Sequence, residues 1–549
     1  MRSVLNPVTG FFRKQSIVEL NLSGEIPEQK EKKLIPFLPG SEKLTYWEVE
    51  YLLSSLERDN SASGIYIRIS GLKIGPARAS SIRKRILELK KSGKKVAVYL
   101  ESGGNMDYLI ASAADVITVP PWTTLNLIGL KAEATFYRDM LDKLGIVASF
   151  IGIGEYKSAS EMFTKSSMSE AHREMIESLV SDLQSQLNSS VAAGRGMTPE
   201  RVRRIMDNGP YTARQALDEG LIDMVGYGKN DFDEIFETSG SRRVKAGRYL
   251  KLLRMKNRMA SVVDTVMRRN NVIAVVSESG FIMSGQNRGG MSIKTIGSDS
   301  TLRALEKLSS DRRVRAVVLR ILTPGGSGAA SDVIRNKLME ISEIKTVVVS
   351  MSDVAASGGY MIALGADYVV ADPMTLTGSI GIVSGKFDLG GLYAKLGINR
   401  GSGKGASRSM MFSSSTNLTP DEEKRLRELL RHYYTEFVNL VSLSRDIDAE
   451  SAEQCSKGRV WTGRQAHSRN LVDELGGLSD AVTLAASKNG IEGPGAYTVK
   501  FISPGNRPRA SSLLRTSSDS GFLTESLSLC ESFRKETVFA LMPYFIKIL

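Results

Sequence analysis

The sequence predicts an α/β protein that contains two copies of one domain. Segments in the two halves match at a spacing of about 250 residues, so that TARQALDEGLIDMVG from Thr212 pairs with TGRQAHSRNLVDELG from Thr462. Within each copy, short β-branched runs alternate with amphipathic helical patterns. Strands separated by helices of this length form βαβ units and a mainly parallel sheet with packed helices.

The elements of the second copy follow from these patterns in chain order. Strands are predicted where β-branched residues cluster, and helices where apolar residues recur every three to four positions. The predicted strands are 315–322, 345–351 and 367–371, and the predicted helices are 328–342, 389–397 and the long segment from Pro420 to about Ser444. Ligands of open parallel sheets bind at the carboxyl ends of strands, and both Ser357 and the glycines of TPGGSG follow a predicted strand.

The 549 residues exceed what one ordinary core organises, so several parts are expected. Residues 1–240 are predicted to form the first copy and to supply a lysine to the site, and 272–500 the second copy, which supplies a serine. Between them, 241–271 reads as a basic linker. Residues 501–549 read as a polar linker that ends in an apolar segment.

The composition is typical of a globular protein without a disulfide framework or a bound metal. Hydrophobic residues make up 42% and charged residues 24% of the chain. Cys455 and Cys530 are the only cysteines. The three histidines, His172, His432 and His467, lie far apart in polar, helix-like segments, where we expect them at the surface. We therefore expect no metal site, and no pattern calls for a cofactor.

Part of the formal net charge of +13 is concentrated in the segment from Arg242 to Asn271. Such a segment could bind an anionic membrane surface or nucleic acid, or could be a solvated linker or helix face. Because aromatic residues are sparse there, nucleic acid is not an expected partner.

Apolar runs do not reach the roughly 18 to 20 residues that a membrane-spanning helix needs. The N-terminal MRSVLNPVTGFFRKQ is too short and broken for a signal peptide, and we expect the first strand to begin almost directly after it, at SIVELNLSG. The apolar C-terminal ETVFALMPYFIKIL could lie on a membrane or pack on a partner.

The two copies differ at the positions that carry reactive groups. Ser357, in VAASGGYM, corresponds to Asn105 of the first copy, which also lacks the glycine turn at Pro324–Gly326. Conversely, Lys157, in GEYKSA, has no lysine counterpart in the second copy. Each copy thus holds what the other lacks, which favours a shared site over two simple turns.

Serine and lysine together can perform nucleophilic catalysis. A serine hydroxyl attacks only when a base accepts its proton, and a buried lysine is neutral enough to be that base. Ser-Lys pairs are a known variant of the catalytic triad. Ser379, in LTGSIGIV, is the candidate for holding the amine, and the amides of Gly326 and Gly358 suit an oxyanion hole.

The motifs TPGGS, AASGGYMIALGAD, LTGSIGIV and GEYKSA resemble those of the Ser-Lys signal peptide peptidases, the protease IV family, in its long double-domain form. The resemblance covers about residues 17 to 485, although Leu322 and Thr323 stand where the family has an Asp or Asn and a Ser before the glycine turn. It implies a Clp protease/crotonase-like fold, with Ser357 as the nucleophile and Lys157 as the general base. Ser379 would orient the lysine, and Gly326 and Gly358 would bind the oxyanion.

The resemblance also implies substrates and partners. Family members cleave apolar signal peptides left after release from preproteins, and they form homotetramers whose clefts face a membrane-proximal chamber. It implies a chain associated with the bacterial inner membrane and facing the periplasm, or with the thylakoid membrane in a plant. Two other functions remain open at this point: a non-catalytic membrane-associated scaffold, and an acyl-CoA hydratase or isomerase of the same superfamily.

Overall fold

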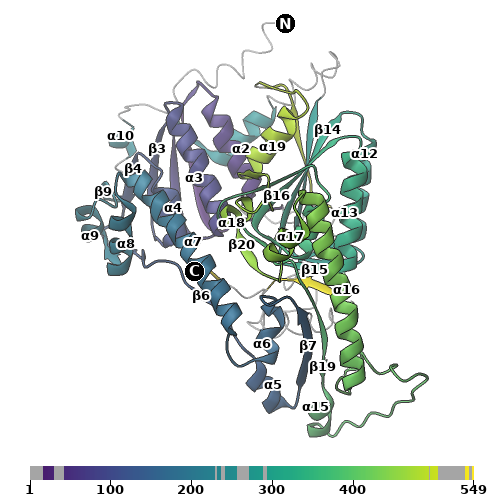
Figure 1. Cartoon of the computed structure of the whole chain (residues 1–549). Coiled ribbons are helices and arrows are strands. Elements are labelled where there is room, and N and C mark those ends of the chain that lie inside the picture. The colour runs from purple at the N-terminus through teal and green to yellow at the C-terminus, as the bar shows by residue number, and fades with distance from the viewer. Residues whose placement is uncertain are drawn as a thin grey trace. The chain divides into compact units, whose positions relative to one another are not determined.

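The computed structural model describes residues 16–29, 43–228, 232–236, 242–255, 271–288, 294–493, 495–504, 538–542 and 547–548. They form two compact units. Unit 1 takes its described residues from Met1–Lys131 and Ser181–Asn270, and unit 2 from Ala132–Val180 and Asn271–Ile548. Figure 1 shows the elements of both in chain order by colour.

Unit 1 is built on a parallel sheet with the strand order β10-β1-β2-β3-β4-β9. Its strands are β1 (Ser16–Glu25), β2 (Ala62–Lys73), β3 (Lys95–Leu100), β4 (Val116–Val119), β9 (Met224–Val225) and β10 (Arg242–Lys245), with a short antiparallel pair of β5 (Thr124–Leu125) and β8 (Tyr211–Thr212). Its helices are α2 (Tyr46–Glu57), α3 (Pro76–Lys91), α4 (Asn105–Ala111), α8 (Pro199–Asn208), α9 (Ala213–Asp218) and α10 (Phe232–Ile235), together with the later part of α7 (Glu170–Arg195). Helices between successive parallel strands are what the βαβ pattern predicts.

Unit 2 contains a related sheet. Strands β22, β11, β14 and β16 lie in this order and are parallel. Both β17 and β18 then pair with β16, and the sheet is extended by β21 next to β17 and by β20 next to β18. The strands are β11 (Val272–Ser279), β14 (Val314–Thr323), β16 (Thr346–Ala356), β17 (Tyr368–Ala371), β18 (Leu376–Gly378), β20 (Val460–Thr462), β21 (Glu474–Leu475) and β22 (Thr498–Ile502). The helices are α5 (Arg138–Leu144), α6 (Glu161–Thr164), α12 (Ser298–Ser310), α13 (Gly328–Ser342), α14 (Gly358–Ala363), α15 (Gly390–Lys395), α16 (Pro420–Arg445), α17 (Ala449–Cys455), α18 (Gly463–His467) and α19 (Leu478–Ser487).

The two sheets repeat one topology, which confirms the predicted duplication and the α/β class. The order β1-β2-β3-β4-β9 of unit 1 returns as β11-β14-β16-β17-β21 in unit 2. Side-chain contacts repeat as well: an arginine at the end of a 26-residue helix pairs with an aspartate in each unit, Arg195 with Asp223 and Arg445 with Asp473. The long helix predicted from Pro420 is α16, and the predicted helix 328–342 is α13.

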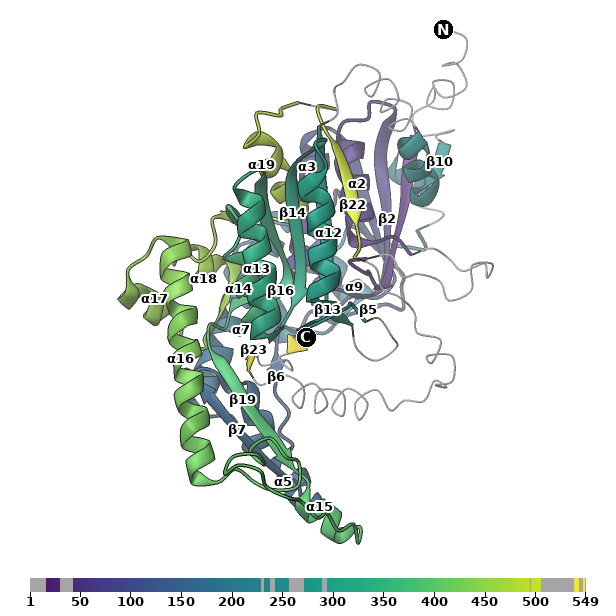
Figure 2. The same cartoon turned by 90° about the vertical axis from the view of Figure 1, so that its right-hand side faces the viewer.

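Unit 2 also contains a second, mixed sheet with the order β13-β12-β15-β23-β19-β7. Its strands are β7 (Val147–Ile153), β12 (Phe281–Met283), β13 (Thr295–Gly297), β15 (Gly325–Ser327), β19 (Ile382–Asp388) and β23 (Phe539–Leu541). Strands β7 and β19 pair antiparallel along their whole length and lie side by side in Figure 2. Two further strands, β6 (Ala132–Glu133) and β24 (Lys547–Ile548), form a separate pair.

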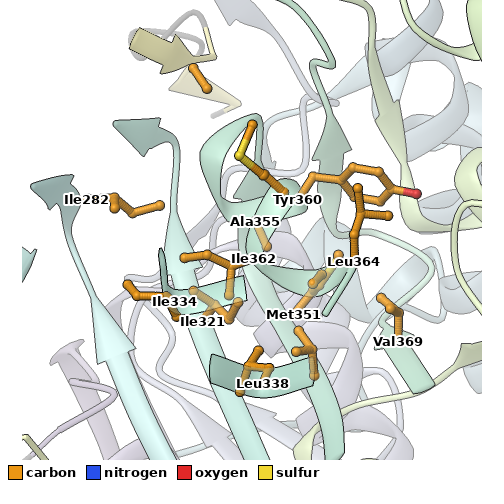
Figure 3. Close-up of a cluster of buried hydrophobic side chains, with 14 of the residues drawn as sticks. Ile282, Ile321, Ile334, Leu338, Met351, Ala355, Tyr360, Ile362, Leu364 and Val369 are labelled. Atoms are coloured by element: carbon orange, nitrogen blue, oxygen red, sulfur yellow. The ribbon is translucent and has the colours of Figure 1, made fainter. Parts of the chain in front are cut away.

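The core of unit 2 includes strand β16, which ends directly before Ser357. Figure 3 shows apolar side chains of β14, α13, β16 and α14 packed together, including Ile321, Ile334, Met351 and Ile362. All four are fully or almost fully buried. Burying an aliphatic side chain of this size contributes about 1.5–3 kcal/mol, so β16 is held firmly where it turns into α14.

The structure differs from the predicted parts of the chain in three places. Residues 132–180, which contain Lys157, belong to unit 2 and not to the unit formed by the rest of the first copy. The start of the predicted basic linker is strand β10 followed by a helix at 246–255, in which Tyr249 is buried and donates to Asp59. In the predicted C-terminal tail, residues 539–541 form β23 of unit 2.

Each difference has the same physical origin. In each segment, a strand pairs with a partner that is distant in the sequence: β7 with β19, β10 with β1, and β23 with β15. Residues 256–270 and 505–537, which complete the predicted linkers, lie outside the described residues. Within the described part of the chain, none of the helices combines the length and apolar character needed to cross a membrane.

Candidate active site

Ser357 lies on a sharp turn between a strand and a helix of unit 2. Strand β16 ends at Ala356 and α14 begins at Gly358, and Ser357 between them has φ +55° and ψ −109°. A non-glycine residue held in such a sparsely populated region stores roughly 1–3 kcal/mol of strain, which surrounding contacts must offset. One such contact is the Ser357 amide, which donates to the Gly378 carbonyl at 2.7 Å.

Lys157 reaches the same place from the loop that follows β7. The lysine backbone is packed tightly against Gly458, since a Cβ placed on that glycine would lie 2.6 Å from the Lys157 nitrogen and 2.7 Å from its Cα. The amide of the neighbouring Tyr156 donates to the carbonyl of Lys457 at 2.8 Å. These backbone contacts to 457–458 fix the direction in which the lysine side chain enters the site.

The lysine amine contacts both candidate serines. Nζ of Lys157 lies 2.8 Å from Ser357 Oγ, 3.1 Å from Ser379 Oγ and 2.8 Å from the Ser379 carbonyl oxygen. The serines are 200 and 222 positions away from the lysine in the sequence, yet all three residues meet within unit 2. The structure thus brings together the three side chains that the sequence singled out.

Burial determines the protonation of this amine. Lys157 is 4% exposed and both serines are 0% exposed. Desolvation lowers the pKa of Lys157 well below its usual value, because an ammonium ion loses its hydration there. The three groups around Nζ are two hydroxyls and one carbonyl, none of which carries a charge that would restore the ammonium form.

A neutral amine matches these three contacts completely. It has two N–H donors, which the Ser379 carbonyl and the Ser379 hydroxyl accept, and one lone pair, which can accept the proton of the Ser357 hydroxyl. An ammonium ion would have a third donor and no lone pair. The geometry therefore suits transfer of a proton from Ser357 to Lys157.

The glycine turn lies against the first residue of α14. Gly325 and Gly326 have φ +112° and +156°, and a Cβ on Gly358 would lie 3.2 Å from the Gly326 nitrogen. The two candidate oxyanion amides are thus neighbours. Thr323 supports the turn, because its buried hydroxyl accepts from the Gly325 amide at 3.1 Å and donates to the Gly325 carbonyl at 3.2 Å.

Several residues near the lysine were not singled out from the sequence. Arg459 stacks over the Tyr156 ring with its guanidinium 4.6 Å from the centroid, and it pairs with Glu174 at 2.6 Å. Glu174 also accepts from the Tyr156 hydroxyl at 3.0 Å. These residues come from three separate segments, and no short-range pattern marks them, so only the fold reveals them.

His172 corrects one expectation. The histidines His432 and His467 are exposed as predicted, but His172 is buried, with Nδ1 3.1 Å from a Glu161 carboxylate oxygen. The polar residues around His172 in the sequence do not indicate its partner Glu161, which lies in the preceding helix α6. Burial alone would raise the pKa of Glu161, but hydrogen bonds from His172 and its neighbours outweigh that effect and lower the pKa to about 2.

In the part of the chain that the structure describes, no three His, Cys, Asp or Glu side chains are grouped so that they could hold a metal ion. Cys455 is buried and free, and Cys530 lies outside the described residues.

Residues 88–238 and 340–492 match the model of peptidase family S49. These two segments together cover more than half of the chain, and each falls in one of the two copies. The chain belongs to peptidase family S49. The matched segments include Lys157, Ser357 and Ser379, and membership makes the protein a serine-type peptidase.

Named relatives agree with this assignment. The chain is 30% identical over 483 residues to the chloroplastic serine protease SPPA of Arabidopsis thaliana, a match that covers 87% of this chain and 70% of that protein. It is 32% identical over 414 residues to protease 4 of Salmonella typhi, covering 74% of this chain and 65% of the Salmonella protein. Among solved structures, it is similar to a mutant of ClpP1 from Listeria monocytogenes, with a TM-score of 0.24, 14% identity, and coverage of 40% of this chain and 99% of that one.

Proposed function

We propose that Ser357 is the nucleophile and Lys157 the general base of an endopeptidase that cuts short apolar peptides, such as signal peptides released from preproteins. The observation that carries this proposal is the 2.8 Å separation of Lys157 Nζ and Ser357 Oγ in a site where burial lowers the pKa of the lysine. A base must be within hydrogen-bond reach and must be neutral to accept a proton. The 2.8 Å contact supports the first requirement, and the lowered pKa of Lys157 favours the neutral form.

In the proposed reaction, Lys157 accepts the Ser357 proton while Oγ attacks the substrate carbonyl carbon. The amides of Gly326 and Gly358 donate to the developing oxyanion, which their neighbouring positions allow. The lysine then gives its proton to the leaving amine, and an acyl-enzyme remains on Ser357. Water, deprotonated by the same lysine, releases the new carboxylate. Ser379 holds Nζ in place through both of its oxygen atoms.

Digestion of a peptide library followed by mass spectrometry tests the substrate class. Leucine-rich, unfolded, signal-like peptides are expected to be cut faster than folded or charged substrates, because a folded surface does not reach the buried Ser357 and charged side chains beside it would lose their hydration. Equal cleavage of charged, folded proteins would contradict the proposed class while leaving the peptidase assignment in place.

We further propose that the chain is a homo-oligomer, a tetramer by family resemblance, and that it works at a membrane surface. At the end of the β7–β19 ribbon, near α5 and α15 in Figure 2, four apolar residues are 43% to 63% exposed: Leu144, Val147, Leu396 and Ile398. Apolar exposure of this kind marks contact surfaces. Light scattering of the intact chain and of Leu396→Asp tests the oligomer, and co-sedimentation with anionic vesicles tests membrane contact at the bacterial periplasmic or thylakoid face.

The two other functions considered from the sequence have direct tests. A scaffold would not react with a fluorophosphonate, whereas the proposed nucleophile would. A hydratase or isomerase would convert an acyl-CoA, and its usual carboxylate bases are not among the groups that contact Lys157 Nζ.

A further inference from the structure

The backbone of Arg459 supports the segment that carries Ser379. The Arg459 carbonyl oxygen accepts from the Ser379 amide at 2.7 Å, and the Gly458 amide donates to the Ile380 carbonyl at 2.7 Å. Ser379 has φ +51°, which lies in the left-handed region that favours glycine, so its conformation depends on contacts of this kind. Residues 458 and 459 therefore fix the backbone that presents the Ser379 oxygens to the lysine amine.

The side chain of Arg459 holds Tyr156, the residue directly before Lys157. The guanidinium carbon lies 4.6 Å from the centroid of the Tyr156 ring and 4.8 Å from that of Trp461, within the roughly 6 Å at which a cation is attracted to an aromatic face. The Tyr156 hydroxyl donates to Glu174 at 3.0 Å, and Glu174 pairs with the guanidinium at 2.6 Å. Arg459, Tyr156 and Glu174 thus each contact the other two.

These contacts restrain the loop of the lysine from two sides. The Tyr156 amide donates to the Lys457 carbonyl at 2.8 Å, so the backbone and the ring of Tyr156 are both attached to residues 457–459. Because Tyr156 and Lys157 share a peptide bond, movement of the tyrosine shifts the lysine Cα. A shift of about 1 Å can take an amine out of reach of the proton that it must accept.

The exposure of the three-residue contact favours a role in positioning over a role in stability. The Glu174 side chain is 56% exposed, and that of Arg459 is 15% exposed. Ion pairs at the surface stabilise a fold little, because water screens them and two long side chains lose conformational freedom. Through Tyr156, however, this surface contact is connected to Lys157, which is 4% exposed and lies in the candidate site.

We propose that Arg459 is a positioning residue for the Ser-Lys site, which holds Lys157 through Tyr156 and Ser379 through its own carbonyl oxygen. The inference rests on the proposed role of Lys157 as the base and adds a residue that acts through its neighbours and not on the reacting atoms. One residue then links two segments more than 200 positions apart in the sequence, whose side chains must meet at the lysine amine.

Steady-state kinetics of full-length Arg459→Met on a leucine-rich peptide tests the inference. Methionine keeps much of the volume of the stem but has no planar cation to hold the tyrosine ring. We expect kcat to fall roughly 10- to 100-fold, because the lysine is displaced, and KM to stay close to that of the wild type. Circular dichroism verifies that the variant is folded. An unchanged kcat would overturn the inference.

Arg469→Met is the matched control. The Arg469 guanidinium also lies over Trp461, with its carbon 3.9 Å from the ring centroid. Its hydrogen bonds go to Gln465 and Ser468, away from the lysine loop. This variant is expected to keep the wild-type kcat. Equal losses of kcat in Arg459→Met and Arg469→Met would overturn the inference, because the loss would then not pass through Tyr156.

A double variant separates positioning from general destabilisation. In a chain that already carries Lys157→Met, adding Arg459→Met should lower the residual kcat/KM little further, because the group that it positions is absent. A loss by the same factor in both backgrounds would overturn the inference. If Lys157→Met alone keeps wild-type activity, the proposed function itself fails. If Lys157→Met is nearly inactive and Arg459→Met is fully active, only the inference fails.

Two substitutions of the tyrosine test the route from Arg459 to the lysine. Tyr156→Phe keeps the ring beneath the guanidinium and is expected to retain most of the wild-type kcat. Tyr156→Leu removes the ring and is expected to lose kcat to the same extent as Arg459→Met, again with little change in KM. Wild-type kcat in Tyr156→Leu would overturn the inference.

Discussion

Lys157 Nζ lies 2.8 Å from Ser357 Oγ, although the two residues are 200 positions apart and come from different copies of the duplicated sequence. The pair is formed inside one compact unit, because residues 132–180 join the second copy. The loop that carries the lysine is thus part of the unit that carries the serine.

Replacing the lysine by an isosteric apolar residue is expected to abolish most of the activity without unfolding the protein. Lys157→Met keeps the volume of the buried stem but has no basic atom, so kcat/KM for an apolar peptide should fall by roughly 10²–10⁴-fold. The kcat/KM of Lys157→Arg should be equally low, because a guanidinium keeps its proton up to about pH 12 and cannot act as a base. Near-normal turnover in Lys157→Met, with folding verified by circular dichroism, would exclude the lysine as the base.

Activity is expected to rise with pH through one ionisation that belongs to Lys157. Desolvation lowers the pKa of this amine, so the base is available well below the range in which lysines ordinarily lose their proton. The kcat/KM of the wild type should therefore increase with pH and level off before about pH 10. A profile that stays flat from about pH 6 to 10 would contradict the role of the amine.

The same lowered pKa links stability to pH. Between the folded pKa of Lys157 and its unfolded value of about 10.4, the unfolded chain binds more protons at this amine, so the free energy of unfolding rises with pH in that window. Lys157→Met lacks this dependence. Its melting temperature should exceed that of the wild type most at low pH, and the difference should shrink toward about pH 10. A constant difference across the range would show that the amine is not desolvated.

Removing the Ser379 hydroxyl is expected to weaken catalysis but not eliminate it. Ser379→Ala loses the 3.1 Å contact to Nζ and keeps the carbonyl contact at 2.8 Å. The loss of one such hydrogen bond should lower kcat by roughly tenfold to hundredfold. Ser158→Ala is a matched control, because the Ser158 hydroxyl is buried beside the lysine without a hydrogen-bond partner, and it should have nearly wild-type activity. Equal losses in both variants would mean that Ser379 has no specific role.

Gly458 is expected to be essential because it makes room for the lysine backbone. In Gly458→Ala the new Cβ would lie 2.6–2.7 Å from backbone and Cβ atoms of Lys157, at a φ of +78°. Lys157 must move, so kcat should fall even under conditions in which the Gly458→Ala protein is still folded. Gly490→Ala has a similar φ of +64° with no atom within 4 Å, so it should cost only about 1–2 kcal/mol of stability and leave kcat unchanged. Equal kcat values in the two variants would contradict this role of Gly458.

The sequence allowed much of the fold and the central site to be predicted, for identifiable reasons. Strand and helix periodicity placed α13 at its observed bounds, and the internal repeat predicted the two related sheets. Comparison of the copies pointed to Lys157 and Ser357, because a duplicated chain retains a reactive residue in one copy where the other has lost it.

Contacts between distant segments were not predictable in the same way. The transfer of residues 132–180 to unit 2 depends on the pairing of β7 with β19, and neither strand has a local signal for its partner. Strand β23 lies in a sequence that is equally suited to a membrane surface. The burial of His172 depends on a carboxylate of a different helix. In each example, the position of the segment depends on a contact with a distant partner, and the local sequence does not indicate which partner that is.

Fluorophosphonate labelling followed by peptide mapping tests the central claim most directly. The account predicts a single modified residue, Ser357, in the wild-type chain, with a labelling rate that rises with pH and falls sharply in Lys157→Met. Labelling of another serine, or undiminished labelling of Ser357 in Lys157→Met, would contradict the Ser-Lys mechanism.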